Sequence, residues 1–190
     1  CDMGALPADL PGYQKVFKPE VQAAFEGYWG RPLSNKVGLT LPEVITAITN
    51  DKVRMLWAFG ENPAVSDPDS NHIQHALAHC EFLVVSDLFL TETAEFADVV
   101  LPAASFAEKE GTFTNTERRV QRVRKAVTPR GNSKPDWVIF MDVMNRLGYP
   151  KKYSNTSQIM NEIAQVTPSY RGISFERIEE VGIQWPCPTK

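Results

Sequence analysis

The chain has 190 residues, of which 43% are hydrophobic and 23% charged, and its formal net charge at pH 7 is -3. This length and apolar content are enough to bury a core, so a disordered tail is excluded. The weak negative charge and the lack of any apolar run near the roughly 20 residues that span a bilayer predict no nucleic-acid partner and no membrane insertion.

The cysteines indicate the compartment. Cys1, Cys80 and Cys187 form no Cys-x-x-Cys pair, which argues against a disulfide framework and a structural zinc site and favours a reducing environment. The chain begins with Cys1 and shows no basic stretch followed by an apolar one, so we expect a piece of a longer polypeptide without a secretory signal. We expect a cytoplasmic location, with export of the parent protein left open.

The N-terminal third predicts a loop and two helices. Residues 1–16 are rich in Pro and Gly and are expected to form an ordered loop. Pro19 begins a short amphipathic helix that ends near Gly30. Thr40, followed by Leu-Pro-Glu, predicts a capped helix that reaches Asn50.

The central part alternates strands and helices. Apolar runs predict strands over 53–59, 82–86 and 98–101, each closed by small or polar residues. Helices are expected between them, from about Asp67 to Cys80 and from Thr91 to Phe96. This order is typical of a parallel α/β layer, in which ligands bind at the carboxyl ends of the strands.

From Gly111 the pattern changes. Residues 112–115 and 120–127 predict a surface hairpin, and helices are expected over about 135–147 and 156–165. The predicted fold class is therefore α/β, a Rossmann-like parallel sheet layer flanked by helices, with a small β-ribbon and helical extension.

Four segments carry a family resemblance. They are Cys-Asp-Met-Gly-Ala-Leu-Pro at 1–7 with Pro-Gly-Tyr-Gln at 11–14, Gly-Glu-Asn-Pro at 60–63, Ala-Glu-Lys-Glu-Gly-Thr-Phe-Thr-Asn at 107–115, and Gln-Trp-Pro-Cys at 184–187. In this order they resemble the molybdopterin oxidoreductases, and more narrowly the large subunit of molybdenum- or tungsten-dependent formate dehydrogenase.

The resemblance implies a middle section of a larger enzyme that oxidises formate to carbon dioxide at a molybdenum or tungsten ion held by two molybdopterin guanine dinucleotides. It implies an iron-sulfur cluster elsewhere in the full protein, electron-transfer subunits as partners besides the rest of the polypeptide, and no catalytic or metal-ligating residue here, so the piece alone is expected to be inactive. Residues 1–105 and 135–150 would form part of the guanine dinucleotide-binding domain, and residues 106–134 and 151–190 would belong to a neighbouring subdomain.

The resemblance also implies the cofactor contacts. It assigns them to six residues, namely Gly60, Asn62, Ser66, Ser86, Asp87 and Asp136. Their chemistry is suitable, because glycine permits close backbone approach, Asn and Ser offer hydrogen bonds, and a carboxylate at a strand end can hold ribose hydroxyls or a guanine amine.

Local structure can also account for several polar residues. Asn62 and Pro63 favour turns, and Asp136 suits the first turn of a helix. His72, His75 and His79 share one helix face, yet helical spacing alone does not make them a metal site. Four arginines suggest a basic strip but are more typical of a solvated face, or of one that docks on acidic protein, namely Arg118, Arg119, Arg122 and Arg124.

A second function class stays open. The chain could be a structural module of a related iron-sulfur subunit of the NADH dehydrogenase type, which lacks the molybdenum cofactor and whose segments resemble residues 107–121.

Overall fold

The computed structural model describes residues 6–190 and divides them into two compact units. The first, here called the α/β unit, consists of residues 39–109 and 126–146. The second, here called the mixed unit, contains residues 6–38, 110–125 and 147–190. This grouping puts residues 6–38 and the parallel strands in different units. The boundaries expected from the sequence put both in one domain, residues 1–105 with 135–150. The assignment of either group to a domain of the parent protein stays a prediction.

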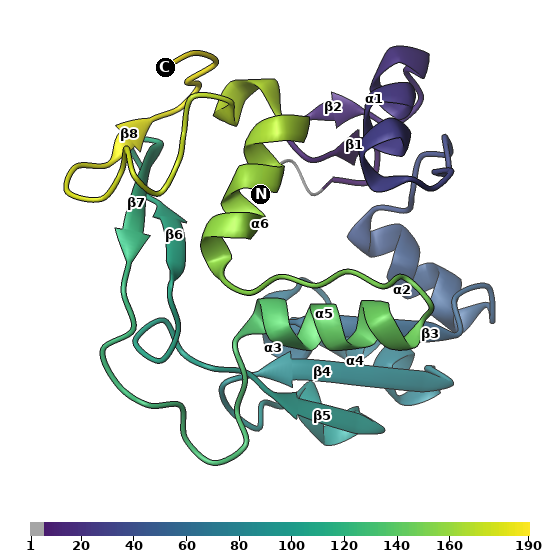
Figure 1. The fold of residues 1–190 in the computed structure, drawn as a ribbon. Helices are drawn as coiled ribbons and strands as arrows, with labels where there is room; N and C mark the ends of the chain where they lie inside the picture. The colour runs from purple at the N-terminus through teal and green to yellow at the C-terminus, as the bar shows by residue number, and fades with distance from the viewer. Residues whose placement is uncertain (1–5) are drawn as a thin grey trace. The chain divides into compact units, whose positions relative to one another are not determined.

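The α/β unit contains a three-stranded parallel sheet, as the apolar runs predicted. Its strands are β3 (Met55–Phe59), β4 (Phe82–Asp87) and β5 (Val99–Pro102), in the order β3-β4-β5. The expected parallel layer is therefore confirmed (Figure 1). Because this order runs without a reversal, the three strands contain no topological switch point, and the loops at their carboxyl ends are the candidate ligand site.

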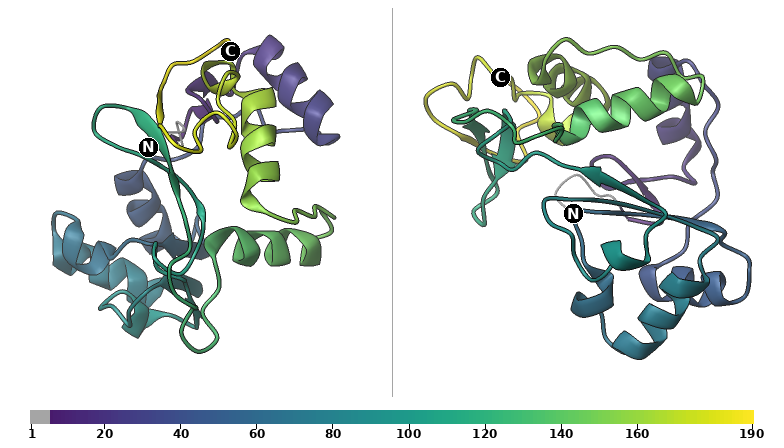
Figure 2. Two further views of the ribbon diagram at one scale, coloured as in Figure 1. Left: turned by 60° about the vertical axis from the view of Figure 1, so that its left-hand side comes forward. Right: turned by 90° about the horizontal axis from the view of Figure 1, so that it is seen from below.

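Helices cover both faces of this sheet (Figure 2). On one face, α2 (Leu41–Thr49) and α4 (Ser70–His79) pack against alternate strand residues in one buried cluster. On the other face, Phe140 of α5 (Asp136–Arg146) contacts Trp57 and Phe59, with ring centroids 5.1 and 4.6 Å apart. The period of two along β3 thus sends successive side chains to opposite helical layers, which is the expected α/β arrangement.

Capping residues set where the helices begin. The backbone N–H and the hydroxyl of Thr40 both donate to a carboxylate oxygen of Glu43, each at 2.7 Å, at the start of α2. At α4, Asp69 accepts the backbone N–H of His72 at 3.3 Å. Two shorter elements lie in the connections, α3 (Pro63–Ser66) and η1 (Ala94–Phe96). The element η1 is a single 3-10 turn, whereas a short helix from Thr91 was expected there.

The mixed unit is built around two helices and two small antiparallel sheets. Helix α1 (Pro19–Trp29) ends beside Gly30, as predicted, and Gly30 adopts the left-handed conformation. Helix α6 is Thr156–Val166. The remaining elements are β1 (Asp9–Leu10), β2 (Gln14–Lys15), β6 (Gly111–Thr114), β7 (Arg119–Val123), η2 (Pro168–Tyr170) and β8 (Ile183–Gln184).

The predicted hairpin forms at the surface, and one face of it packs against the rest of the mixed unit. β6 pairs with β7 as expected, and β8 then adds a third strand against β7 (Figure 1). Val120 on β7 is 1% exposed and belongs to a second buried cluster. The guanidinium of Arg122 lies 4.0 Å from the ring centroid of Phe175 and 2.9 Å from a carboxylate oxygen of Glu179. Intramolecular partners, rather than solvent alone, therefore surround this basic residue.

Glu162 connects α6 to α1 and to the segment before α6. Its carboxylate accepts the indole N–H of Trp29 at 2.9 Å and the hydroxyl of Tyr153 at 2.8 Å, and it lies 2.9 Å from the Nζ of Lys151. Burial, with the neighbouring Glu162 as the next cause, raises the pKa of Tyr153 well above its ordinary value of 10.0. The phenol therefore stays protonated and keeps donating.

Two negative findings apply to residues 6–190 only. No helix in this range has both the length and the apolar character that crossing a membrane requires. Cys80 and Cys187 are free in the same range, and Cys1 lies outside it, as do residues 2–5 of the opening family segment.

Candidate functional site

The carboxyl ends of β3, β4 and β5 meet at one edge of the parallel sheet. Phe59 lies beside Ser86, and Asp87 lies beside Pro102. The pairing continues past β3, because the N–H of Gly60 donates to the carbonyl of Ser86 at 2.8 Å. Three of the six predicted residues, Gly60, Ser86 and Asp87, are therefore neighbours, and the parallel register alone brings them together.

Asn62 joins the loop after β3 to the loop after β4. Its amide oxygen accepts both the backbone N–H of Thr93 at 3.1 Å and the Thr93 hydroxyl at 2.7 Å. Its amide nitrogen donates to a carboxylate oxygen of Glu92 at 2.7 Å, and this hydrogen bond is the main cause that lowers the pKa of Glu92. Thr93 is fully buried and also accepts the N–H of Ala64 at 3.1 Å. The side chain of Asn62 is thus engaged within the chain and holds two loops in register.

Asp87 ends β4 and turns toward its own loop. One carboxylate oxygen accepts the N–H of Leu88 at 2.6 Å and that of Phe89 at 3.4 Å. The other oxygen has no hydrogen-bond partner among residues 6–190, and the residue is half-buried. Asp87 can therefore accept a further donor from a ligand.

Gly60 presents open backbone beside Asp87. Its φ is +60°, and a Cβ built at this position would meet nothing within 4 Å. A residue with a side chain would be strained in this conformation, so glycine suits both the turn and a close approach by a ligand.

The two predicted serines have partners inside the chain. Ser86 is 1% exposed, and its hydroxyl oxygen accepts the indole N–H of Trp57 at 2.8 Å. Ser66, at the end of α3, is exposed and donates to the carbonyl of Asn62 at 3.1 Å. Ser66 therefore lies at the surface, whereas a ligand would have to displace Trp57 to reach the hydroxyl of Ser86.

Asp136 begins α5 and forms an ion pair with Lys109. Both side chains are about three-quarters buried, with 27% and 23% of their surface exposed. The segment before α5 pairs with the chain after β5, because the N–H of Ala104 donates to the carbonyl of Lys134 at 2.8 Å. This pairing brings the first turn of α5 to the carboxyl end of β5.

Sequence reasoning missed three residues that shape this edge. Glu92 and Thr93 hold Asn62, and Lys109 holds Asp136. The segment Thr-Glu-Thr at 91–93 gave a signal, because these polar residues follow an apolar run directly. Lys109 is part of the family segment at 107–115, but its spacing from Asp136 gave no indication of a contact.

The predicted histidine face is present on α4 and makes ordinary contacts. The rings of His75 and His79 stack with centroids 6.3 Å apart, and His79 lies 3.1 Å from a carboxylate oxygen of Asp51. Within residues 6–190 no group of three or more His, Cys, Asp or Glu side chains converges on a common point.

A family model described as Molybdopterin oxidoreductase matches residues 2–146, which include all six candidate residues. The chain belongs to the molybdopterin oxidoreductase family. It is 53% identical to the F420-dependent formate dehydrogenase subunit alpha of Methanocaldococcus jannaschii over 98% of its length, and 50% identical over its whole length to the F420-dependent formate dehydrogenase 2 subunit alpha of Methanococcus maripaludis. A putative formate dehydrogenase of Staphylococcus haemolyticus is 47% identical over 97% of the chain.

The chain spans only part of these relatives. It covers 28% of the length of the two archaeal subunits and 19% of the staphylococcal protein. Among solved structures, acetylene hydratase from Pelobacter acetylenicus matches 90% of the chain with a TM-score of 0.64 at 19% identity, and the chain covers 25% of that protein. This structural likeness supports the fold alone.

Proposed function

We propose that this chain is the cofactor-binding middle segment of a formate dehydrogenase large subunit. The observation that carries the proposal is the high identity, over almost the whole chain, to subunits named formate dehydrogenase. The whole protein would oxidise formate to carbon dioxide, with the rest of the polypeptide and electron-transfer subunits as its partners and the cytoplasm as its location.

The sheet edge would hold the guanine nucleotide part of a molybdopterin guanine dinucleotide. Asp87 fits this role best, because one carboxylate oxygen is available to the donors of a guanine base or of a ribose. Gly60 leaves room for close approach, and Asn62 would act by holding the two loops in place. The remaining three residues stay candidates with narrower roles: Ser66 at the surface, Ser86 beneath Trp57, and Asp136 through its pair with Lys109.

When bound, the cofactor would supply two-electron redox chemistry at its molybdenum or tungsten ion. This chain would contribute binding and orientation. The polar groups at the strand ends are held by the sheet and by the hydrogen bonds of Asn62, so little conformational entropy would be lost when the nucleotide binds. An iron-sulfur cluster would be held elsewhere in the full protein.

The experiment compares the full-length subunit with its Asp87→Ala variant. Guanine nucleotide released by acid and bound metal are measured after gel filtration, and formate oxidation is measured with a redox dye as acceptor. A hydrogen bond to a charged group is worth about 1.5–3 kcal/mol, so Asp87→Ala should weaken nucleotide retention roughly 10- to 100-fold. Glu95→Ala, which removes an exposed carboxylate from the loop between β4 and β5, is the matched control.

Two outcomes would contradict the proposal. Normal nucleotide content in a folded Asp87→Ala variant would mean that the loop after β4 is an ordinary turn. A wild-type subunit that holds an iron-sulfur cluster but neither guanine nucleotide nor molybdenum or tungsten would instead support the structural module of the NADH dehydrogenase type.

A further inference from the structure

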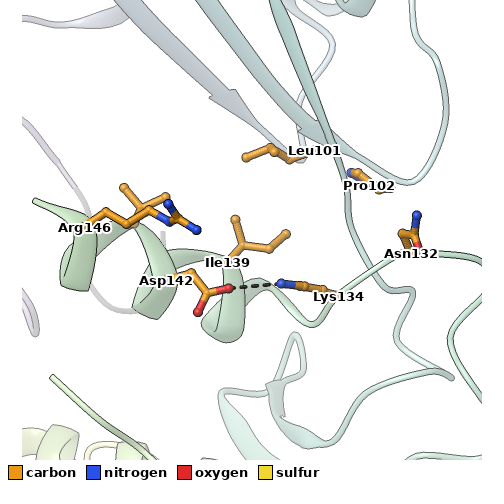
Figure 3. Close-up of a pocket in the computed structure, with 8 residues that line it drawn as sticks. Leu101, Pro102, Asn132, Lys134, Ile139, Asp142 and Arg146 are labelled. Carbon is orange, nitrogen blue, oxygen red and sulfur yellow. Dashed lines mark hydrogen bonds and ion pairs between the residues drawn. The ribbon is translucent and has the colours of Figure 1, made fainter.

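A second candidate site lies between β5 and α5, in a pocket of about 260 Å³ (Figure 3). The end of β5, the segment before α5 and one face of α5 form its walls, and the lining includes Asn132, Lys134, Ile139, Asp142, Val143 and Arg146. None of the six candidate cofactor residues lines it. The four helical residues recur at spacings of three and four, so they form a single stripe along α5.

The charges in the pocket are unevenly paired. Asp142 and Arg146 are four residues apart on α5, which would favour an ion pair between them. A carboxylate oxygen of Asp142 instead lies 3.1 Å from the Nζ of Lys134, and the dashed line in Figure 3 marks this ion pair. Arg146 makes no hydrogen bond or ion pair within the part of the chain that the structure describes. A single guanidinium is therefore left available beside the pocket.

The helix dipole accounts for only part of this arrangement. A cation such as Arg146 is favoured in the last turn of a helix. That effect explains the charge but not the apolar surface next to it, where Ile139 is 6% exposed and Val143 is half-buried. An apolar wall with a free guanidinium at one end and the exposed Asn132 at the other, as Figure 3 shows, is suited to an amphipathic ligand.

We propose that this pocket binds a short-chain aliphatic carboxylate. Lys134 and Asp142 cancel, so the lining carries one net positive charge, which suits an anionic group. The planar fork of Arg146 matches a carboxylate, and Ile139 and Val143 match an aliphatic chain. The volume lies below the roughly 300–1,000 Å³ of pockets for drug-sized ligands, so the ligand is small. The site is independent of the cofactor and of formate, which has no apolar part to bury.

The test uses the purified full-length subunit and butyrate as the probe. Saturation-transfer NMR measures binding of butyrate, with butyramide as the neutral counterpart. We expect saturable binding of butyrate and at least tenfold weaker binding of butyramide, because butyramide lacks the charge that would pair with Arg146. Equal binding of butyramide and butyrate, or no saturable binding of butyrate, would overturn the proposal.

Variants locate the binding. Arg146→Met removes the charge, Val143→Phe fills the pocket while leaving the charge, and Arg171→Met removes an exposed arginine that does not line the pocket. Each of the first two should weaken butyrate binding at least tenfold, and the third should not change it. Normal binding by both pocket variants would refute the assignment.

A measurement on the wild-type subunit covers the case in which a variant does not fold. Phenylglyoxal modifies accessible arginines, and mass spectrometry follows its reaction at Arg146. Butyrate should slow this reaction while butyramide does not. Equal rates with the two compounds would contradict a carboxylate site at Arg146.

Discussion

Replacing Asn62 by alanine separates a positioning role from a ligand-contact role. The Asn62 side chain makes its three hydrogen bonds with Thr93 and Glu92, across 30 or 31 residues of sequence. Alanine would remove all three and leave the loops after β3 and β4 without this connection. The sheet beneath should persist, because its strands pair through backbone groups that the substitution does not touch.

The magnitude follows from the burial of Thr93. Its hydroxyl and its N–H would both lose their acceptor at a residue that is fully buried. An intramolecular hydrogen bond contributes about 1 kcal/mol net, and an unsatisfied buried donor costs more, so the two loops should be destabilised by about 2 kcal/mol. The bond to Glu92 is exposed and should add little. At 1.4 kcal/mol for each factor of ten, amide exchange through local opening should quicken roughly 30-fold.

Hydrogen exchange followed by mass spectrometry on the full-length subunit measures this effect in peptides that cover residues 60–66 and 88–96. Thr93→Val should give a similar change in the same peptides, since it also removes the acceptor of the Ala64 N–H. Asn50→Ala is the control, because the amide of Asn50 is exposed and, among residues 6–190, bonds only to the carbonyl of Thr46 in the preceding helix α2. Unchanged exchange in both loops of Asn62→Ala, or an equal change in the Asn50 control, would refute the argument.

Two further predictions concern other parts of the fold. The hydrogen bonds from Thr40 lower the pKa of Glu43 below 4.5, so Glu43 contributes stability above that value and loses it as the pH falls through its folded pKa. Glu43→Gln should therefore flatten the dependence of the thermal unfolding midpoint on pH between about pH 6 and pH 3, and a variant that parallels the wild type would count against the capping role of Glu43. Glu162→Ala should reduce the free energy of unfolding by about 2–4 kcal/mol, because it leaves the donors of Trp29 and Tyr153 unpaired, and denaturant titration should show this. Gln165→Ala, at an exposed position of the same helix, should cost far less, and equal costs for the two variants would exclude a special role for Glu162.

The sequence by itself determined the elements with local or periodic causes. The apolar runs at 53–59, 82–86 and 98–101 became the parallel strands because buried strands are continuously apolar. Thr40 and Glu43 determined where α2 begins. Pro19 determined the start of α1 and Gly30 its end, since capping acts within a few residues. The parallel arrangement also brought Gly60, Ser86 and Asp87 to one edge, as expected from strand ends.

Only the tertiary structure decided which polar groups remain available to a ligand. Asn62 and Asp136 are chemically suitable for cofactor binding in the sequence, yet their side chains contact Thr93 and Lys109, which are 31 and 27 residues away. The two-residue strand β8 is likewise too short for any periodic signal, and it forms because β7 offers a free edge more than 60 residues earlier in the chain. Such partners depend on how distant segments pack, and residue type and spacing along the chain carry no record of that packing.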